Sequence, residues 1–390
     1  MTSPDREPPL HGVRVIEIGQ VISAPFAGLL LADLGAEVIK VERPGTGDSA
    51  RNPEVTGFRG KSATFLTLNR NKASVCLDLT SAEDYGLFAE LIADTDVLLT
   101  NMVPAVARRL RTDPESVRQL NPAIITCRVL GFRADHPQVE EPSFDLTHQA
   151  LAGYLTLGGL DGDEPARVAI PVADLGVALF SVIGILAALH NRARTGQGDD
   201  LDVPMFDTLL SLLTYQATLY LNEGQIPQRL GSAHPHTAPW QTFRAADRAF
   251  VIAVRNEKFW LRLCQSIGLP QLAADPRFAS NALRIANRAE LQAELERVFA
   301  ARPADEWLAQ FRADGVPVAP VQTIKDALDS EVTSASPLIQ HFTDSEIGEV
   351  AIVGNPLRFR RMRLAAPRPA PGLDEQKAAP DRRARRPLGS

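Results

Sequence analysis

The stretch VRVIEIGQVISAPFAGLLLADLGAEVIKVE, residues 13–42, decides the fold class. Its two ends, 13–19 and 36–42, are short apolar runs that are typical of buried strands. The apolar segment between them has Pro25 near its start and Gly35 at its end, which favours a helix with those limits. A strand, a helix and a second strand in close succession predict two parallel strands joined by a crossover helix.

The same alternation continues along the first part of the chain. Further buried strands are expected at 73–79, 95–101 and 123–129, with a helix at 80–93 and helical segments around 104–120. Thr80 and Glu83 have the spacing of a capping box. Strands that alternate with helices imply a parallel sheet covered on both faces. We therefore expect an α/β large domain with a doubly wound, Rossmann-like parallel sheet.

A long apolar helix is expected within residues 171–198, with Asp174 at its start. An aspartate there can be an N-cap, whose carboxylate accepts backbone N–H bonds. It can also be a nucleophile, because the positive end of the helix dipole favours the ionised carboxylate. The two interpretations are compatible. We expect the apolar run to be too short and too interrupted by glycine and serine to span a membrane.

The composition changes near residue 223, where a loop rich in Gly, Pro and His begins. One strand (249–254) and several amphipathic helices follow, which predict a second, smaller α+β domain. The expected division is 1–222 for the large domain, 223–325 for the small domain, and 326–390 for a return to the large domain. This last part includes strands within 349–364 and ends in a solvated tail with the basic cluster RRARR at 382–386.

Composition and cysteine usage exclude several classes of protein. The formal charge of −6 over 390 residues argues against nucleic acid as a partner. Three cysteines without CxxC spacing predict neither a disulfide framework nor a zinc site. We expect no metal, because the one close histidine pair, His234 and His236, has no carboxylate nearby. With no N-terminal apolar run to suggest a signal peptide, a cytoplasmic protein without a membrane partner is expected.

The common motifs of nucleotide binding and hydrolysis do not match. The turn GQVISAPFAG after the first strand has one glycine where the G-x-G-x-x-G fingerprint needs three, so dinucleotide binding is not favoured. The chain has no G-x-S-x-G elbow, and GTGDSAR lacks the lysine and the spacing of a P-loop.

Five co-linear segments resemble the class III CoA-transferases, the group that contains formyl-CoA transferase, carnitine CoA-transferase and α-methylacyl-CoA racemase. The segments are GLLLADLGAEVIKVERPGTGD, LNRNKASVCLDL, PVADLGVALFSVIGILAALHNRARTGQGDDLDVPMFD, ADPRFASNALRIANRAEL and GVPVAPV. They run in the family's order and extend over about 20–360, nearly the whole chain. The resemblance implies that coenzyme A enters as an acyl-CoA thioester and that a small carboxylic acid is the other substrate.

The resemblance also implies the residues of the site. The family's catalytic aspartate corresponds to Asp174, which would form an aspartyl–acyl anhydride and then an aspartyl-CoA thioester. CoA would bind along the carboxyl ends of the first strands. The residues implied for CoA binding are Ser23, Arg43, Leu77, Asn101, Met102 and Arg109, with the two arginines at the adenine and phosphate end. The family further implies an interlocked homodimer.

Several positions depart from the family pattern. Met102 and Leu130 are apolar where relatives often carry lysine or arginine, and the usual GxGxxGP reads GFRADHP. The small domain has no run of glycines that could form a lid, and PGLDEQ replaces the closing LGEHT. Two alternatives remain, of which the second is motivated by the missing basic residues. One is an acyl-CoA epimerase that uses Asp174 with a histidine, for which His148 is the candidate. The other is a CoA-ester binding protein without turnover.

Overall fold

The computed structural model describes residues 7–375, which form two compact units. Of these residues, the large unit contains 7–152, 168–221 and 336–375, and the small unit contains 153–167 and 222–335. Segment 153–167 belongs to the small unit, where Leu160 forms a bridge with Leu230. The basic cluster 382–386 lies outside the described residues.

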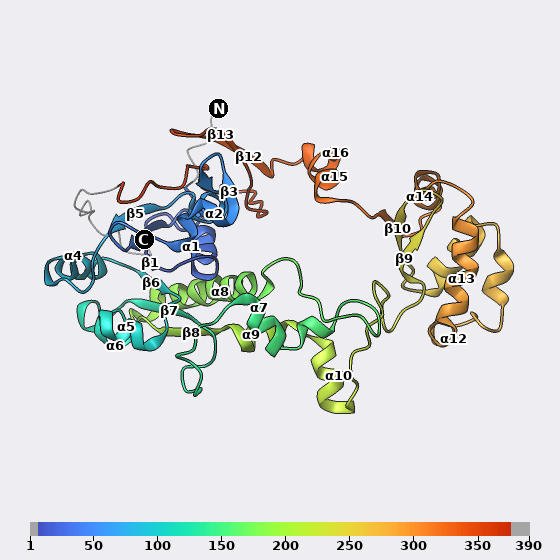
Figure 1. Cartoon of the computed structure of the whole chain (residues 1–390), viewed down its shortest axis with the longest axis horizontal. Helices are drawn as coiled ribbons and strands as arrows, with labels where there is room; N and C mark the ends of the chain where they lie inside the picture. Colours follow the sequence, from blue (N-terminus) through green and yellow to red (C-terminus); the bar gives the residue numbers. More distant parts are fainter. Residues whose placement is uncertain (1–6, 376–390) are drawn as a thin grey trace. The chain divides into compact units, whose positions relative to one another are not determined.

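The central sheet of the large unit consists of six parallel strands (Figure 1). In order across the sheet they are β5 (Ala73–Cys76), β2 (Glu37–Glu42), β1 (Arg14–Ile18), β6 (Val97–Thr100), β7 (Ile125–Leu130) and β8 (Asp200–Pro204). The chain builds outward from β1 through β2 to β5 and then continues on the other side of β1 with β6. The predicted mixed α/β fold with a central parallel sheet is confirmed, and the winding direction reverses between β1 and β6.

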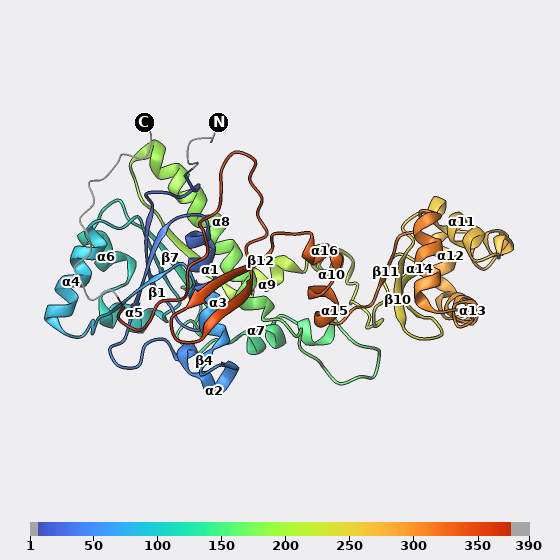
Figure 2. The same ribbon diagram turned by 90° about the horizontal axis from the view of Figure 1, so that it is seen from above.

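Helices cover both faces of this sheet, which is why β1 and β6 are buried along their whole length. On one face, Phe88 of α4 (Ala82–Ala93) and Val117 of α6 (Pro114–Leu120) pack in one apolar cluster with Ile16 and Ile18 of β1. On the other face, α1 (Ser23–Asp33) contacts β1 and β2. Figure 2 shows α8 (Val172–Thr195) next to α1, and α8 also contacts β7 and β8.

The start of α4 differs from the capping box expected at Thr80 and Glu83. The N-cap is Ser81, and its side chain makes no capping hydrogen bond. The hydroxyl of Thr80 donates instead to the carboxylate of Asp78, at 2.6 Å. A short polar side chain that forms a hydrogen bond within a nearby turn cannot also cap the helix, so the capping-box prediction was wrong.

The length of α8 also differs from the sequence expectation. With 24 residues, it is long and apolar enough to cross a membrane by length and composition alone, so the prediction that the run is too short was wrong. Part of it serves as a core helix: 44% of its most apolar window is buried within the protein. Its packing partners include α9 (Met205–Leu212) and α7 (Asp145–Leu151).

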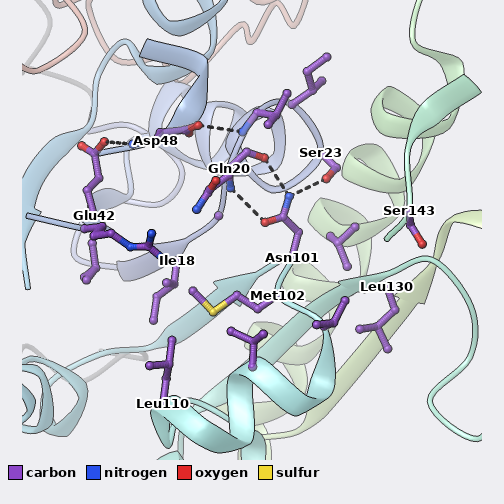
Figure 3. Close-up of a pocket in the computed structure, with 18 of the residues that line it drawn as sticks. Ile18, Gln20, Ser23, Glu42, Asp48, Asn101, Met102, Leu110, Leu130 and Ser143 are labelled. Atoms are coloured by element: carbon purple, nitrogen blue, oxygen red, sulfur yellow. Dashed lines mark hydrogen bonds between the residues drawn. The ribbon is translucent and has the colours of Figure 1, made fainter. Parts of the chain in front are cut away.

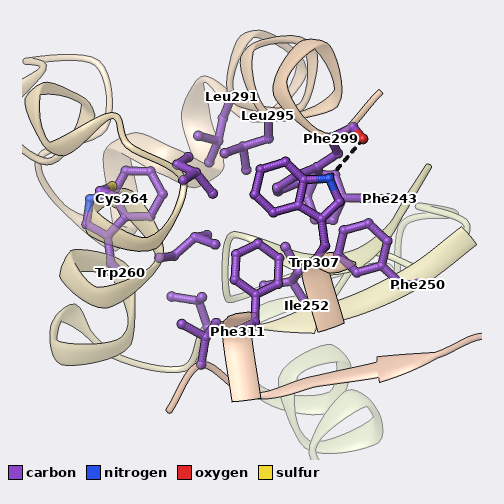
Figure 4. Packing of buried hydrophobic residues seen from close by; sticks show 14 of the residues in the cluster. Phe243, Phe250, Ile252, Trp260, Cys264, Leu291, Leu295, Phe299, Trp307 and Phe311 are labelled. Atoms are coloured by element: carbon purple, nitrogen blue, oxygen red, sulfur yellow. Dashed lines mark hydrogen bonds between the residues drawn. The ribbon is translucent and has the colours of Figure 1, made fainter. Parts of the chain in front are cut away.

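The small unit has an antiparallel sheet of three strands where the sequence predicted one. β10 (Ala249–Ala253) pairs with β9 (Trp240–Arg244) on one side and with β11 (Val318–Pro320) on the other. Aromatic rings fill the core between this sheet and the helices, and the indole of Trp307 donates to the carbonyl of Phe299 (Figure 4). The helices around this core are α11 (Glu257–Ser266), α12 (Asn281–Ala286), α13 (Arg288–Phe299) and α14 (Ala304–Ala313). Two short helices, α15 (Ile324–Leu328) and α16 (Glu331–Ser334), follow without buried residues.

After the small unit, a hairpin of β12 (Ile339–Asp344) and β13 (Gly348–Val353) belongs to the large unit. The ammonium group of Lys61 lies 2.9 Å from the carboxylate of Asp344 and fixes the hairpin to an earlier part of that unit. Beyond Val353 the described chain forms no further strand, although the sequence suggested strands up to residue 364. The large unit also contains a 3-10 turn at Ser49–Arg51, α2 (Pro53–Thr56), β3 (Gly57–Phe58), β4 (Lys61–Ser62), α3 (Ala63–Asn69), α5 (Pro104–Leu110) and most of α10 (Tyr215–Glu223), which ends in the small unit.

Candidate active site

A cavity of about 460 Å³ lies at the carboxyl ends of the central strands (Figure 3). Its walls include 19–22, which join β1 to α1, and 101–103, which follow β6. These are the two strands between which the winding direction reverses. Loops leave such a point in opposite directions and open a crevice, which is the usual ligand site of open α/β sheets.

All seven residues that the sequence suggested for the site line this one cavity. Asp174 comes from α8, Ser23 from α1 and Arg109 from α5, so segments far apart in the sequence meet here. The seven residues are Ser23, Arg43, Leu77, Asn101, Met102, Arg109 and Asp174. Their shared location supports a single site.

Asp174 is not an N-cap. The N-cap of α8 is Pro171, and Asp174 lies in the first turn of the helix. Asp145 of α7 takes the capping role from outside the helix, because its carboxylate accepts the N–H of Ala173 at 2.8 Å. Within residues 7–375, the Asp174 carboxylate has no hydrogen bond and no ion pair. It is therefore available to a ligand in the cavity.

The environment of Asp174 favours the protonated carboxyl group. Burial, followed by the negative charge of Asp145, raises the pKa of Asp174 from 3.8 to about 7. The sequence-based expectation that the helix start keeps this group ionised therefore holds only above about pH 7. A carboxyl group with such a pKa, in a cavity and close to a like charge, is characteristic of functional sites.

Sequence reasoning missed Asp145 as a member of the site. Together with Ser143 and Phe144, it lines the cavity. Its other carboxylate oxygen accepts from the side chain of Gln149 at 2.7 Å, so the group is held on both sides. The available signal was its place at the start of a short helix, which is also a common position for an ordinary surface aspartate.

His148, the candidate proton carrier of the epimerase alternative, does not line the cavity. Its side chain is buried, and its ring nitrogens lie 3.2 Å from the carbonyl oxygen of Phe144 and 3.1 Å from that of Gly131. A histidine held in this way between two backbone carbonyls stabilises the local structure. The geometry gives no support to a proton-transfer role for it.

The comparisons with known proteins decide the family. The sequence model of CoA-transferase family III matches residues 10–377. The chain belongs to this family, and it is an enzyme, a class III CoA-transferase. The acetyl-CoA:oxalate CoA-transferase of Acetobacter aceti is 36% identical over 95% of this chain and 94% of its own length. The succinyl-CoA:glutarate CoA-transferase of Mus musculus is 31% identical, over 95% of this chain and 85% of its own length.

Solved structures of similar proteins support the same assignment. A CaiB/BaiF family protein from Brucella suis has a TM-score of 0.83 and 35% identity, with 95% of this chain and 97% of that chain covered. A hypothetical protein from Mycobacterium tuberculosis has a TM-score of 0.85 and 32% identity, with 95% and 99% covered. The large coverage indicates that both units of this CoA-transferase have counterparts in those chains.

Two exposed arginines supply positive charge to the cavity of this CoA-transferase. Arg43 follows β2 and Arg109 lies in the last turn of α5. Within the described part of the chain, neither guanidinium group forms a hydrogen bond or an ion pair. The nearby Arg51, by contrast, is already paired, and binds the carboxylate of Glu42 at 2.7 Å. Among the described residues that line the cavity, the guanidinium groups of Arg43 and Arg109 are thus free to bind phosphate.

The remaining predicted residues form a neutral part of the wall. Met102 packs against the apolar cluster between the sheet and α4, and Leu130 is buried. The amide of Asn101 donates to the carbonyl of Gln20 at 2.9 Å and to the hydroxyl of Ser23 at 3.1 Å, while its oxygen accepts the N–H of Gln20. Asn101 therefore also fixes the loop that follows β1.

No group of three or more His, Cys, Asp or Glu side chains that could hold a metal ion occurs among residues 7–375. His234 and His236 lie in the small unit and do not line the cavity. Cys76, Cys127 and Cys264 are not joined in disulfide bonds. Burial raises the pKa of Cys127 to about 12, which keeps it a neutral thiol at physiological pH.

Proposed function

We propose that this enzyme moves CoA from an acyl-CoA thioester to a carboxylic acid through covalent intermediates on Asp174. The observation that carries the proposal is the position of that carboxylate: it lines the cavity and has no partner among the described residues. Arg43 and Arg109 would bind the phosphate groups of CoA, because both line the cavity and neither forms an ion pair with another described residue.

The proposed reaction begins when the ionised carboxylate of Asp174 attacks the thioester carbonyl and expels the CoA thiolate, which leaves an aspartyl–acyl anhydride. The thiolate then attacks the aspartyl carbonyl and releases the donor acid, which forms an aspartyl-CoA thioester. The acceptor carboxylate attacks this thioester and again expels the thiolate. Finally, the thiolate attacks the acceptor's carbonyl carbon, which gives the new acyl-CoA and regenerates the Asp174 carboxylate. Each intermediate, whether anhydride or thioester, is itself an activated acyl group, so the free energy of the CoA thioester bond is kept, provided that water is excluded.

We propose a dicarboxylic acid as the acceptor. Several relatives are named for such acids: oxalate in Acetobacter aceti, glutarate in Mus musculus and mesaconate in Haloarcula hispanica. These acids differ in chain length and in saturation. A panel of oxalate, succinate, glutarate and mesaconate is therefore the natural first set of acceptors for this enzyme.

The proposal predicts a covalent adduct that hydroxylamine can trap. The protein is incubated with acetyl-CoA or succinyl-CoA and hydroxylamine, and its peptides are mapped by mass spectrometry. An aspartyl hydroxamate is expected on Asp174, because hydroxylamine attacks both the anhydride and the aspartyl thioester. The control, without acyl-CoA, gives none. Binding of acyl-CoA without any adduct would instead indicate an epimerase or a binding protein without turnover.

The raised pKa of Asp174 predicts an acid limb in the pH profile. Only the ionised carboxylate attacks a thioester, so kcat/KM is expected to rise with pH through about 7. In Asp145→Asn the neighbouring negative charge is absent and the pKa of Asp174 falls, so the limb is expected to move to lower pH. The substituted amide keeps an oxygen that can accept the Ala173 N–H. Initial rates from pH 5 to 9 test this, and a limb that does not move would exclude the charge of Asp145 as a contributor to the raised pKa beside burial.

We also propose that a second copy of this chain covers the exposed apolar face of α8. Leu179, Phe180, Ile183 and Leu186 have helical spacing on one face and are 37–61% exposed, which is unusual for a surface that remains in water. A homodimer is expected in sedimentation velocity at micromolar concentration. A stable monomer under those conditions would contradict the proposal.

A further inference from the structure

The loop that follows β1 contains a strained residue at the cavity. Val21 has a backbone φ of 67°, in the left-handed region that β-branched residues rarely adopt. It lines the cavity together with Gln20 and Ile22. Strain of this kind persists only where the surrounding structure holds the residue in place. The contacts that hold Val21 therefore also determine the shape of this wall.

Asp48 provides the contact that holds the backbone of Val21. One oxygen of its carboxylate accepts the N–H of Val21 at 3.1 Å and the N–H of Ala50 at 2.8 Å. Asn101 instead fixes neighbours of Val21, namely Gln20 and Ser23. Figure 3 shows Asp48 on the opposite side of this loop from Asn101. The hydrogen bond of the Val21 N–H thus depends on the Asp48 carboxylate.

The Asp48 carboxylate is itself fixed by a buried charge. The ammonium group of Lys40 lies 2.9 Å from its second oxygen and also donates to the carbonyl of Gly19 at 2.6 Å, just before the strained loop. Lys40 further binds Glu17, which binds Lys72, and the side chains of all four charged residues are fully buried. Of these four, Asp48 lines the cavity and the other three do not. It connects the buried charges to the cavity wall.

We propose that Asp48 is a positioning residue for CoA binding: its carboxylate, held by Lys40, keeps Val21 in the left-handed conformation and so fixes the wall formed by 20–22. The inference rests on the proposed function, in that it takes the cavity as the CoA site. It assigns to the buried charges a role beyond stability. Without the Asp48 oxygen, Val21 relaxes toward an ordinary conformation, and the backbone of this wall moves.

The test measures the dissociation constant of CoA by titration calorimetry, which requires no chemical step at Asp174. Asp48→Ala is expected to weaken CoA binding by at least about tenfold, because small displacements of a binding wall have large effects. The double variant Asp48→Ala/Val21→Gly is expected to bind CoA at least about threefold more tightly than Asp48→Ala alone, because glycine adopts φ near 67° without steric cost. Asp48→Asn, which keeps an acceptor oxygen, should bind better than Asp48→Ala.

A matched pair outside the cavity separates positioning from stability. Asn71 also has a left-handed backbone, with φ 66°, and its amide donates to the buried carboxylate of Asp33 at 2.9 Å. Asp33→Ala removes a similar buried acid, and CoA affinity within about twofold of wild type is expected at temperatures where the variant is folded.

Three results distinguish the possible failures. Failure of the wild-type protein to bind CoA would overturn the assignment of the cavity, and with it the positioning role. If the wild type binds CoA and Asp48→Ala binds equally well, the positioning role alone is wrong. If Val21→Gly restores nothing in the Asp48→Ala background, while Asp48→Ala remains folded by circular dichroism, the backbone of Val21 is not what Asp48 controls.

Discussion

Asp174→Asn is expected to lower the rate of CoA transfer by roughly 10⁴-fold or more, the scale at which loss of a covalent nucleophile is usually felt. The amide has nearly the size of the carboxylate, so the cavity keeps its shape, but an amide does not attack a thioester. Because the chemical step is affected rather than binding, the dissociation constant of CoA should stay close to its wild-type value. Initial rates with succinyl-CoA and each acceptor acid, together with calorimetry, measure the two effects.

The control for this variant is Asp305→Asn. Asp305 also lies in the first turn of a helix whose N-cap is a proline, but in α14 of the small unit and outside the cavity lining. Its replacement should leave the transfer rate within about twofold of wild type, as is usual for exposed positions. Transfer by Asp174→Asn at more than a few per cent of the wild-type rate would show that Asp174 is not the nucleophile.

The substitution Asp174→Asn is also expected to stabilise the protein at alkaline pH. The pKa of Asp174 is about 7 in the folded state and near its ordinary value of 3.8 in the unfolded state, so the folded protein binds this proton more tightly. The ionised group therefore costs stability above pH 7, the cost declines as the pH falls from 7 to 3.8, and it is absent below 3.8. Urea denaturation at about pH 8 should give a higher free energy of unfolding for Asp174→Asn, with no difference at about pH 3.5.

Glu17→Gln is expected to lower the free energy of unfolding by about 3–5 kcal/mol, since it removes one partner from a fully buried set of charges. The Glu17 carboxylate lies 2.8 Å from the ammonium group of Lys40 and 2.7 Å from that of Lys72. An amide oxygen still accepts a hydrogen bond, but Lys72 loses its ion pair with Glu17, while Lys40 keeps its ion pair with Asp48. Guanidinium chloride denaturation at about pH 7 measures the loss.

The pH dependence of the Glu17 effect has a definite sign. Burial raises the pKa of Glu17, but the charges of Lys40 and Lys72 outweigh it and hold the pKa below the ordinary value of 4.5. A carboxyl group whose folded-state pKa is depressed stabilises the protein above its unfolded-state pKa, and this stabilisation is lost as the pH falls through the folded-state value. The difference between Glu17→Gln and wild type should therefore be full at neutral pH and should diminish only below pH 4.5.

An exposed ion pair provides the control for Glu17. Lys325 and Asp329 form an i,i+4 pair with side chains 82% and 64% exposed. Solvent screens such pairs, so Asp329→Asn should change the free energy of unfolding by no more than about 0.5 kcal/mol. If both variants lost similar amounts of unfolding free energy, burial of the charges around Glu17 would not be the cause of their large contribution to stability.

The sequence by itself determined the alternation of strands and helices, the parallel sheet and the family. These features depend on local periodicity and on motifs within continuous stretches, such as 13–42. Through the resemblance to the family, it also suggested seven residues that line one cavity. Four of them, Arg43, Leu77, Asn101 and Met102, follow strands of the sheet, and the other three lie on helices. It predicted β10 of the small unit but missed β9 and β11, whose short, mixed patterns become strands only through pairing with β10.

Only the tertiary structure decided the environment of the catalytic candidate. It places Asp145 rather than Asp174 at the N–H of Ala173, near the start of α8. Local spacing in the sequence could not indicate this contact, because the acceptor comes from another helix. Long-range packing likewise buries Glu17, Lys40, Asp48 and Lys72 together, although the first and the last are 55 positions apart in the chain. Electrostatic environments depend on distances between residues remote in sequence, and those distances exist only once the chain has folded.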